Sequence, residues 1–91
     1  MASVLNNEIK QEFNMFGEIF TFYKKFYHPE TSEEKVTING KKITVEEAYW
    51  LSVMQESGEL YEKYKLPICK ALLVAIINEF DRKAVEAIEE A

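Results

Sequence analysis

The spacing of apolar residues in the first third of the chain predicts a long helix with two apolar rows. In the first row, apolar residues recur at steps of four and three, which keeps them on one helical face. The first row comprises Leu5, Ile9, Phe13, Phe16, Phe20, Tyr23 and Tyr27. The second row, beside it, comprises Met15, Ile19, Phe22 and Phe26. Over residues 15–26 the two rows together span about half of the helix circumference, which is more than a small bundle covers.

We expect the first row to pack against the rest of the chain and the second row to need another partner. Glu8 and Glu12 stand where the second row would continue toward the N-terminus, so the excess of apolar surface is confined to residues 15–26. Two partners are open: a β-hairpin of the same chain, or another protein. An apolar helical surface of this kind indicates binding rather than catalysis.

This first helix is predicted over residues 4–27. His28-Pro29 ends it, because the residue before a proline is biased away from helical backbone angles. A β-hairpin is predicted over residues 36–45, where β-branched residues flank Asn39-Gly40. Both turn residues tolerate a positive φ, which hairpin turns require.

A four-residue hairpin loop sets Ile38 opposite Ile43 and Val36 opposite Val45. An isolated two-stranded hairpin is marginally stable in water. We therefore expect the hairpin to lean on a helix, and the second row of the first helix is the natural support.

A second helix is predicted over residues 45–64, because Thr44 and Glu47 have the spacing of a capping box. Gly58 interrupts this helix and suggests a bend or a close helix approach there. One arc of the helix carries its apolar residues, namely Tyr49, Trp50, Val53, Met54, Leu60, Tyr61 and Tyr64.

A third helix is predicted over residues 67–89, with Pro67 at its first position, where a missing amide costs nothing. Residues 71–77 are apolar on every side, so we expect this helix in the middle of the core. The fold is therefore predicted to be mainly α: a three-helix bundle with a short β-hairpin between helices 1 and 2. Residues 1–91 are expected to form a single domain.

The charge balance disfavours nucleic acid and anionic membranes as partners. The formal net charge is −5, with Arg82 as the only arginine. Phosphate repels such a chain, and arginine forks are the usual means of recognising phosphate and guanine. The longest apolar run has seven residues, whereas a membrane span needs about 20.

A nucleic-acid-associated regulator that uses four lysines of helix 1 and the hairpin tip remains the alternative. These are Lys24, Lys25, Lys41 and Lys42.

Candidate chemistry is sparse. A nucleophilic Cys69 needs a base, and His28 is the only histidine, so we expect a buried cysteine and no catalytic site. One histidine and one cysteine cannot build a structural zinc site, and Glu8 and Glu12 lack the histidines of a di-metal bundle site. We expect no metal, no cofactor and no enzymatic activity. With no disulfide and no recognisable secretory signal, a cytoplasmic location is expected.

Core aromatic residues and helix caps follow one pattern in Tyr49-Trp50, in residues 60–64, 67–73 and 79–83, and at the aromatic end of helix 1. On these segments, about two thirds of the chain resembles small, uncharacterised helical proteins encoded by phages and integrative elements of Gram-positive gut bacteria. The hairpin departs from the shorter connection expected in that group. The resemblance implies stoichiometric binding, including inhibition of host defence proteins in the manner of anti-CRISPR proteins.

The sequence therefore predicts a non-enzymatic protein-binding module that forms a homo-oligomer, expected to be a dimer. The identity of any other protein partner is open. The predicted interface consists of Met15, Ile19, Phe22, Phe26, Asn39, Gly40, Lys41 and Lys42.

Overall fold

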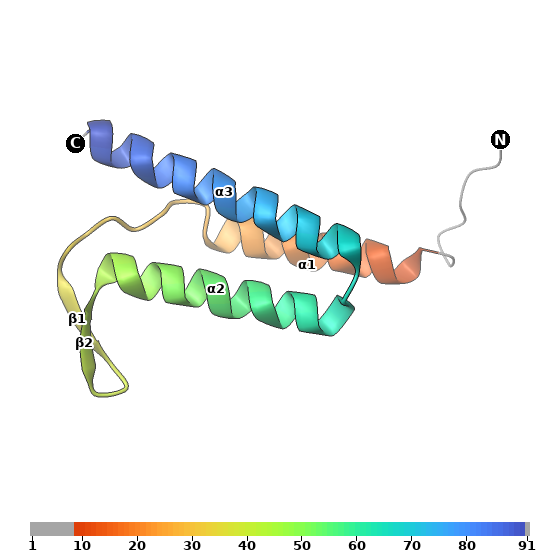
Figure 1. The fold of residues 1–91 in the computed structure, drawn as a ribbon, viewed down its shortest axis with the longest axis horizontal. Helices are drawn as coiled ribbons and strands as arrows, with labels where there is room; N and C mark the ends of the chain where they lie inside the picture. Colours follow the sequence, from red (N-terminus) through yellow and green to blue (C-terminus); the bar gives the residue numbers. More distant parts are fainter. Residues whose placement is uncertain (1–8, 91) are drawn as a thin grey trace.

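The structure is a computed structural model that describes residues 9–90. Three helices lie along one another, and an antiparallel two-stranded hairpin separates the first two, which confirms the predicted fold class (Figure 1). α1 and α3 run in the same direction and α2 runs against them. The elements are α1 (Lys10–Lys25), β1 (Lys35–Ile38), β2 (Lys41–Thr44), α2 (Val45–Tyr64) and α3 (Pro67–Glu90).

The helix bounds follow the predicted ones closely except in α1. α2 begins and ends at the predicted residues, and α3 begins with Pro67 as predicted. α1 ends at Lys25, two residues before the predicted end. The predicted start at residue 4, with Leu5 and Glu8, lies outside the described residues.

The hairpin register differs from the predicted one because the loop has two residues rather than four. Asn39 and Gly40 have φ values of 52° and 80°, so both central positions take the left-handed conformation. A turn of this kind matches the right-handed twist of the flanking strands. It sets Val36 opposite Ile43 and leaves Ile38 opposite a lysine.

The capping box predicted at the start of α2 is present. The Glu47 amide donates to Thr44 Oγ1 over 3.0 Å, and the Thr44 amide donates to Glu47 Oε1 over 3.5 Å. Thr44 is also the last residue of β2, so no linker separates the hairpin from the helix.

Backbone carbonyls of the segment before the hairpin satisfy two further amides at the start of α2. Val45 donates to the Glu34 carbonyl over 2.8 Å, and Glu46 donates to the Ser32 carbonyl over 3.1 Å. The first amides of a helix have no intrahelical partner, so these bonds hold residues 32–34 against the helix end.

The hairpin does not cover the second row, contrary to expectation. It projects from the N-terminal end of α2 (Figure 1), and Val36 and Ile38 remain 36% and 42% exposed. Aromatic side chains of α2 and α3 cover the second row instead. Phe22 packs on Phe80 and Phe26 packs on Tyr49.

The core is centred on Phe80 of α3, which is fully buried. Its ring centre lies 5.9 Å from that of Phe22 and 5.8 Å from that of Tyr23, both on α1. It lies 6.5 Å from the ring centre of Tyr49 on α2. Edge-to-face and offset ring pairs at such distances are favourable beyond the apolar area they bury. One side chain therefore joins all three helices.

Each helix buries one stripe of side chains around this centre. Met15, Val53 and Cys69 have no exposed surface. The core cluster comprises Met15, Ile19, Phe22, Phe26, Tyr49, Val53, Tyr64, Cys69, Leu73 and Phe80.

The expectation that α3 is buried on every side is wrong. Leu73 is 4% exposed, but Val74 beside it is 50% exposed, and Ala71 and Ala75 are also exposed. In a bundle of three helices each helix contacts two others, so none occupies the middle and one stripe of each is enclosed. None of the helices in the described part of the chain combines the length and the apolar character that a bilayer crossing requires.

Tyr49 makes a buried polar contact between α2 and the end of α1. Its hydroxyl donates to the Phe26 carbonyl over 2.7 Å. Phe26 follows the last residue of α1, where carbonyls lack intrahelical partners, so this bond caps the helix end. Burial, and secondarily the Glu30 carboxylate, raises the pKa of the Tyr49 hydroxyl to about 12.

We expect Phe80→Ala to lower the free energy of unfolding by about 3–5 kcal/mol, because it removes a fully buried ring and leaves a cavity. Val74→Ala, on the exposed side of the same helix, is expected to change it by less than about 1 kcal/mol. Urea unfolding followed by circular dichroism measures both. Equal losses for the two variants would contradict the central position of Phe80.

The raised pKa of Tyr49 predicts a loss of stability in alkaline solution. Between pH 10 and about 12 the unfolded chain releases the Tyr49 proton while the folded chain retains it. The free energy of unfolding should then fall by up to about 1.4 kcal/mol per pH unit from this group alone. Tyr49→Phe lacks the ionisable hydroxyl, so its stability should fall less steeply between about pH 10 and about pH 12. Parallel slopes for the two proteins would refute the assignment.

Candidate interaction surface

The second row, predicted as the apolar part of an interface, lies inside the molecule. Met15, Ile19, Phe22 and Phe26 are at most 6% exposed and belong to the core. The prediction that these four side chains face outward is therefore wrong. Their own α2 and α3 enclose them.

Charged residues beside the second row form ion pairs between α1 and α2. Lys63 Nζ lies 2.9 Å from Glu18 Oε2, and Lys25 Nζ lies 2.7 Å from Glu56 Oε2. Both pairs join α1 to α2, and both form because the second row lies between the helices. In both pairs, opposite charges on α1 and α2 lie level with each other along the two helices, which agrees with the packing of the second row between them. The spacing of apolar residues alone does not reveal this pairing.

The first row supplies the exposed apolar surface instead. Phe13, Phe16 and Phe20 are 68%, 44% and 60% exposed. These three residues, which we call the aromatic face of α1, lie within eight consecutive residues on one side of the helix. Tyr23, farther along the same row, turns toward the core and stacks on Phe80.

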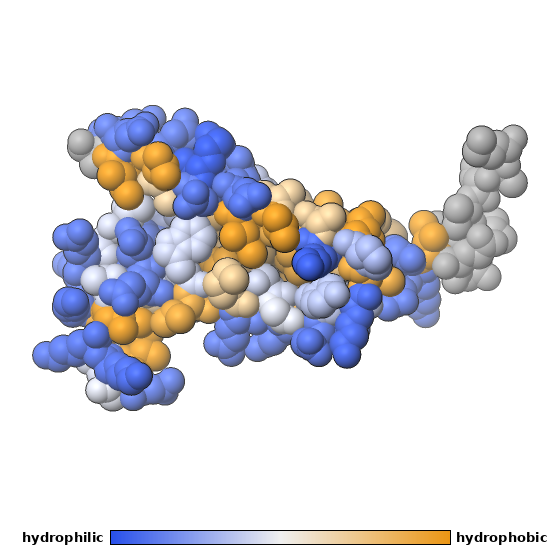
Figure 2. Space-filling model, viewed as in Figure 1, coloured by the Kyte–Doolittle hydropathy of each residue, from blue (hydrophilic) through white to orange (hydrophobic). Residues whose placement is uncertain are grey.

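Apolar side chains also gather on the surface over α2 and α3 (Figure 2). Leu51 and Met54 of α2 are 60% and 57% exposed, and Val85 and Ile88 of α3 are also exposed. These residues carry no rings, and Leu51 and Met54 lie beside Glu46 and Glu47. The aromatic face of α1 differs in having three large rings on one helix.

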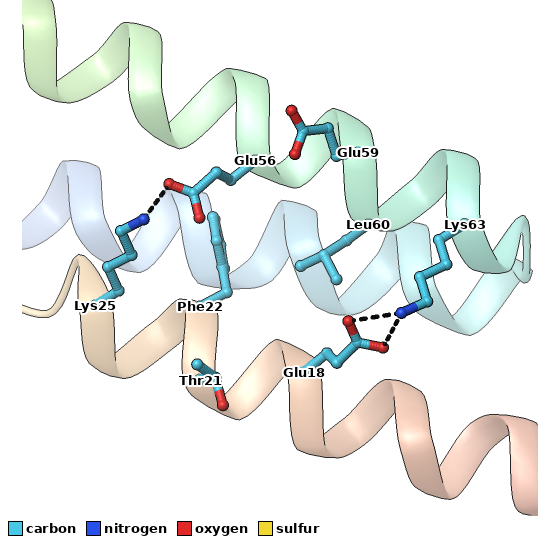
Figure 3. A pocket seen from close by; sticks show the side chains of 8 residues that line it. All are labelled: Glu18, Thr21, Phe22, Lys25, Glu56, Glu59, Leu60 and Lys63. Atoms are coloured by element: carbon cyan, nitrogen blue, oxygen red, sulfur yellow. Dashed lines mark hydrogen bonds and ion pairs between the residues drawn. The ribbon is translucent and has the colours of Figure 1, made fainter.

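A groove of about 340 Å³ separates α1 from α2 (Figure 3). Phe22 and Leu60 point into it, and the two ion pairs bridge its ends. The Tyr64 hydroxyl and, next, the Lys63 ammonium donate to Glu18 and lower the pKa of its carboxyl group. The charges at both ends of the groove are thus paired between the helices. The groove is therefore part of the packing of α1 against α2.

The polar half of the predicted interface lies at the hairpin turn. Asn39, Gly40, Lys41 and Lys42 are all exposed. Their role in binding stays a prediction. The turn presents two lysines and an asparagine to solvent, whereas the aromatic face of α1 presents phenylalanine rings.

The lysines of the alternative nucleic-acid surface are partly engaged within the chain. The Lys25 ammonium is paired with Glu56, and the Lys24 ammonium lies 5.5 Å from the centre of the Phe20 ring. This leaves Lys41 and Lys42 at the turn of the hairpin as the remaining members of the predicted set.

Cys69 is fully buried, as expected, and burial raises the pKa of its thiol. His28 is exposed, and its ring packs edge-on against Tyr27. Lys83 of α3 lies at the end of α1 and donates to the Tyr27 carbonyl over 3.2 Å. Within residues 9–90, no three His, Cys, Asp or Glu side chains are grouped so that they could hold a metal ion.

Comparison of the chain with protein families, with curated proteins and with solved structures gives no match.

The ion pairs along the groove are exposed to solvent and should contribute little to stability. We expect Glu56→Gln to lower the free energy of unfolding by less than about 1 kcal/mol, because water and salt screen the pair with Lys25. Urea unfolding at low and high salt measures the change. A loss of several kcal/mol would show that the ion pair contributes more to stability than its exposure to solvent indicates.

Proposed function

We propose that this protein is a non-enzymatic binding module that acts by docking the aromatic face of α1 against another protein surface. The observation that carries the proposal is the exposure of Phe13, Phe16 and Phe20 on one helix. Single exposed apolar residues are normal on a protein surface, whereas three neighbouring rings form a contiguous apolar patch.

The size of this face suits a binding anchor. Phenylalanine side chains offer on the order of 200 Å² each, so the exposed parts of the three rings amount to about 350 Å². That is close to the largest apolar patch of a typical monomer, and such patches are often functional. Buried aromatic side chains also dominate the energetics of known interfaces.

The specific case we propose is a stoichiometric inhibitor of a host defence protein, comparable to anti-CRISPR proteins. Its support is the resemblance of residues 60–64, 67–73 and 79–83 to small proteins of phages and integrative elements. Inhibition of this kind needs a surface and no chemistry, which agrees with an exposed apolar face as the main feature.

A nucleic-acid-associated regulator is less well supported. A net charge of −5 repels the phosphates of a nucleic acid, and the ammonium group of Lys25 is already paired with Glu56. The hairpin lysines alone make a small basic surface.

The binding role is tested with two variants that remove similarly exposed apolar side chains. Phe20 and Leu51 are both 60% exposed, on α1 and α2 respectively. We expect immobilised Phe20→Ser to lose the proteins that wild type retains from an extract of cells that naturally carry the gene, because one of the three rings of the docking face is gone. Leu51→Ser should retain them. Equal retention by Phe20→Ser and wild type would refute the role of the aromatic face.

A further inference from the structure

The outer edge of β1 carries backbone groups that point away from the rest of the hairpin. In an antiparallel pair, opposite residues alternate between those that exchange backbone hydrogen bonds and those that do not. The bond from the Val45 amide to the Glu34 carbonyl fixes this alternation, so the backbone groups of Lys35 and Thr37 point outward. Within residues 9–90, no hydrogen bond uses these outward groups. A row of free donors and acceptors on a strand edge is a template for a further strand.

The outer edge of β2 is less open to a further strand. The outward amide of Thr44 donates to Glu47 Oε1, and α2 begins at the next residue. All four residues of β1, by contrast, are exposed. A further strand can therefore join the hairpin along β1.

The two faces of the hairpin differ in chemistry. Side chains alternate between the faces along each strand, and residues paired across the strands share a face. One face thus carries Val36, Ile38, Lys41 and Ile43, and the other carries Lys35, Thr37, Lys42 and Thr44. Residues 35–44 hold three lysines and no acid, in a chain whose net charge is −5. The hairpin is therefore a basic element of an acidic protein, with one mainly apolar face.

We propose that β1 binds an extended segment of another protein in which acidic and apolar residues alternate, and that this segment joins the hairpin as an antiparallel third strand. Its backbone bonds to Lys35 and Thr37. Its acidic side chains lie on the face of Lys35 and Lys42, and its apolar side chains cover Val36 and Ile38. This site is separate from the aromatic face of α1, so the inference goes beyond the proposed function and does not depend on it.

The charge of the hairpin selects an acidic strand over a second copy of the chain. Continuing the sheet with β1 of a second copy gathers Lys35 and Lys42 of both copies on one face, where like charges repel. An acidic strand replaces this repulsion by attraction, because its carboxylates lie next to the same ammonium groups. Neither lysine forms an ion pair within residues 9–90, so both charges are available to a partner.

The hairpin is already ordered in the form that a third strand needs. Thr44 belongs to both β2 and the cap of α2, and the bonds from Val45 and Glu46 hold the segment before β1. Binding to a pre-ordered element costs little conformational freedom. A two-stranded hairpin is marginal by itself, and a third strand that covers its apolar face makes it more stable. The exposed Val36 and Ile38 also favour a protein segment over nucleic acid, whose backbone is charged throughout.

A synthetic seven-residue peptide of alternating glutamate and valine, titrated into the full chain, tests the inference. Chemical shifts of backbone amides in NMR spectra report both affinity and position, and we expect the largest changes at residues 35–38. The peptide should bind at least about tenfold more tightly than a matched peptide of alternating lysine and valine. Raising the salt concentration from about 0.05 M to about 0.5 M should weaken binding, because the charged side chains are exposed.

The antiparallel arrangement is tested by methylating the amides of the peptide. In this arrangement the glutamate amides face β1 and the valine amides face away from it. Methylation of the glutamate amides should abolish binding at about 1 mM peptide, whereas methylation of the valine amides should change the affinity by less than about threefold.

The charge preference is tested with Lys35→Glu, and Lys70→Glu serves as the matched control. Both lysines are exposed, on β1 and α3 respectively, and neither forms an ion pair within the described residues. Lys35→Glu should bind the glutamate–valine peptide at least about fivefold more weakly and the lysine–valine peptide more tightly. Lys70→Glu should bind both as wild type does. Thermal melting followed by circular dichroism should be similar for the two variants.

The results separate this inference from the proposed function. No binding of the glutamate–valine peptide, equal effects of the two methylations, or equal losses in Lys35→Glu and Lys70→Glu would each overturn the third strand. Displacement of the peptide by duplex DNA, or shifts confined to residues 13–20, would also overturn it. Phe20→Ser should bind the peptide as wild type does. If Phe20→Ser loses captured proteins while the peptide does not bind wild type, the proposed function stands and this inference fails.

Discussion

The packing of three aromatic side chains around Phe80 is the contact on which the arrangement of the helices depends. Phe22 and Tyr23 reach it from α1, and Tyr49 reaches it from α2. Phe22 belongs to the second row and Tyr23 to the C-terminal end of the first row, so packing on Phe80 turns the second row inward and leaves Phe13 and Phe20 of the first row outside. The inside of the protein thus determines which surface it offers to others.

A bundle of only three helices also explains why so much apolar surface remains. Each helix encloses a single stripe, and every further apolar position stays in contact with water. On α3 this leaves small or aliphatic side chains such as Val74 exposed, and on α1 it leaves rings. The exposed rings are therefore a consequence of two apolar rows on a helix that has neighbours for one.

The helices and strands could be predicted from the sequence because the signals that mark them are local. Thr44 with Glu47, the pair Asn39-Gly40, and Pro67 each define an element boundary within a few residues. The inward row of α1 was not predictable in this way, since both rows have helical spacing. That choice depends on contacts between distant residues, such as Phe22 with Phe80 and Glu18 with Lys63. The hairpin register was wrong because a four-residue loop was assumed, whereas Asn-Gly is typical of a two-residue turn.

The absence of a linker between β2 and α2 gives the hairpin a mechanical property. Thr44 belongs to both elements, and the bonds from Val45 and Glu46 to the segment before β1 close the junction from the other side. The hairpin therefore cannot swivel independently of α2. A displacement of the hairpin is therefore passed to the N-terminal end of α2, which holds Tyr49 and its contact with the end of α1.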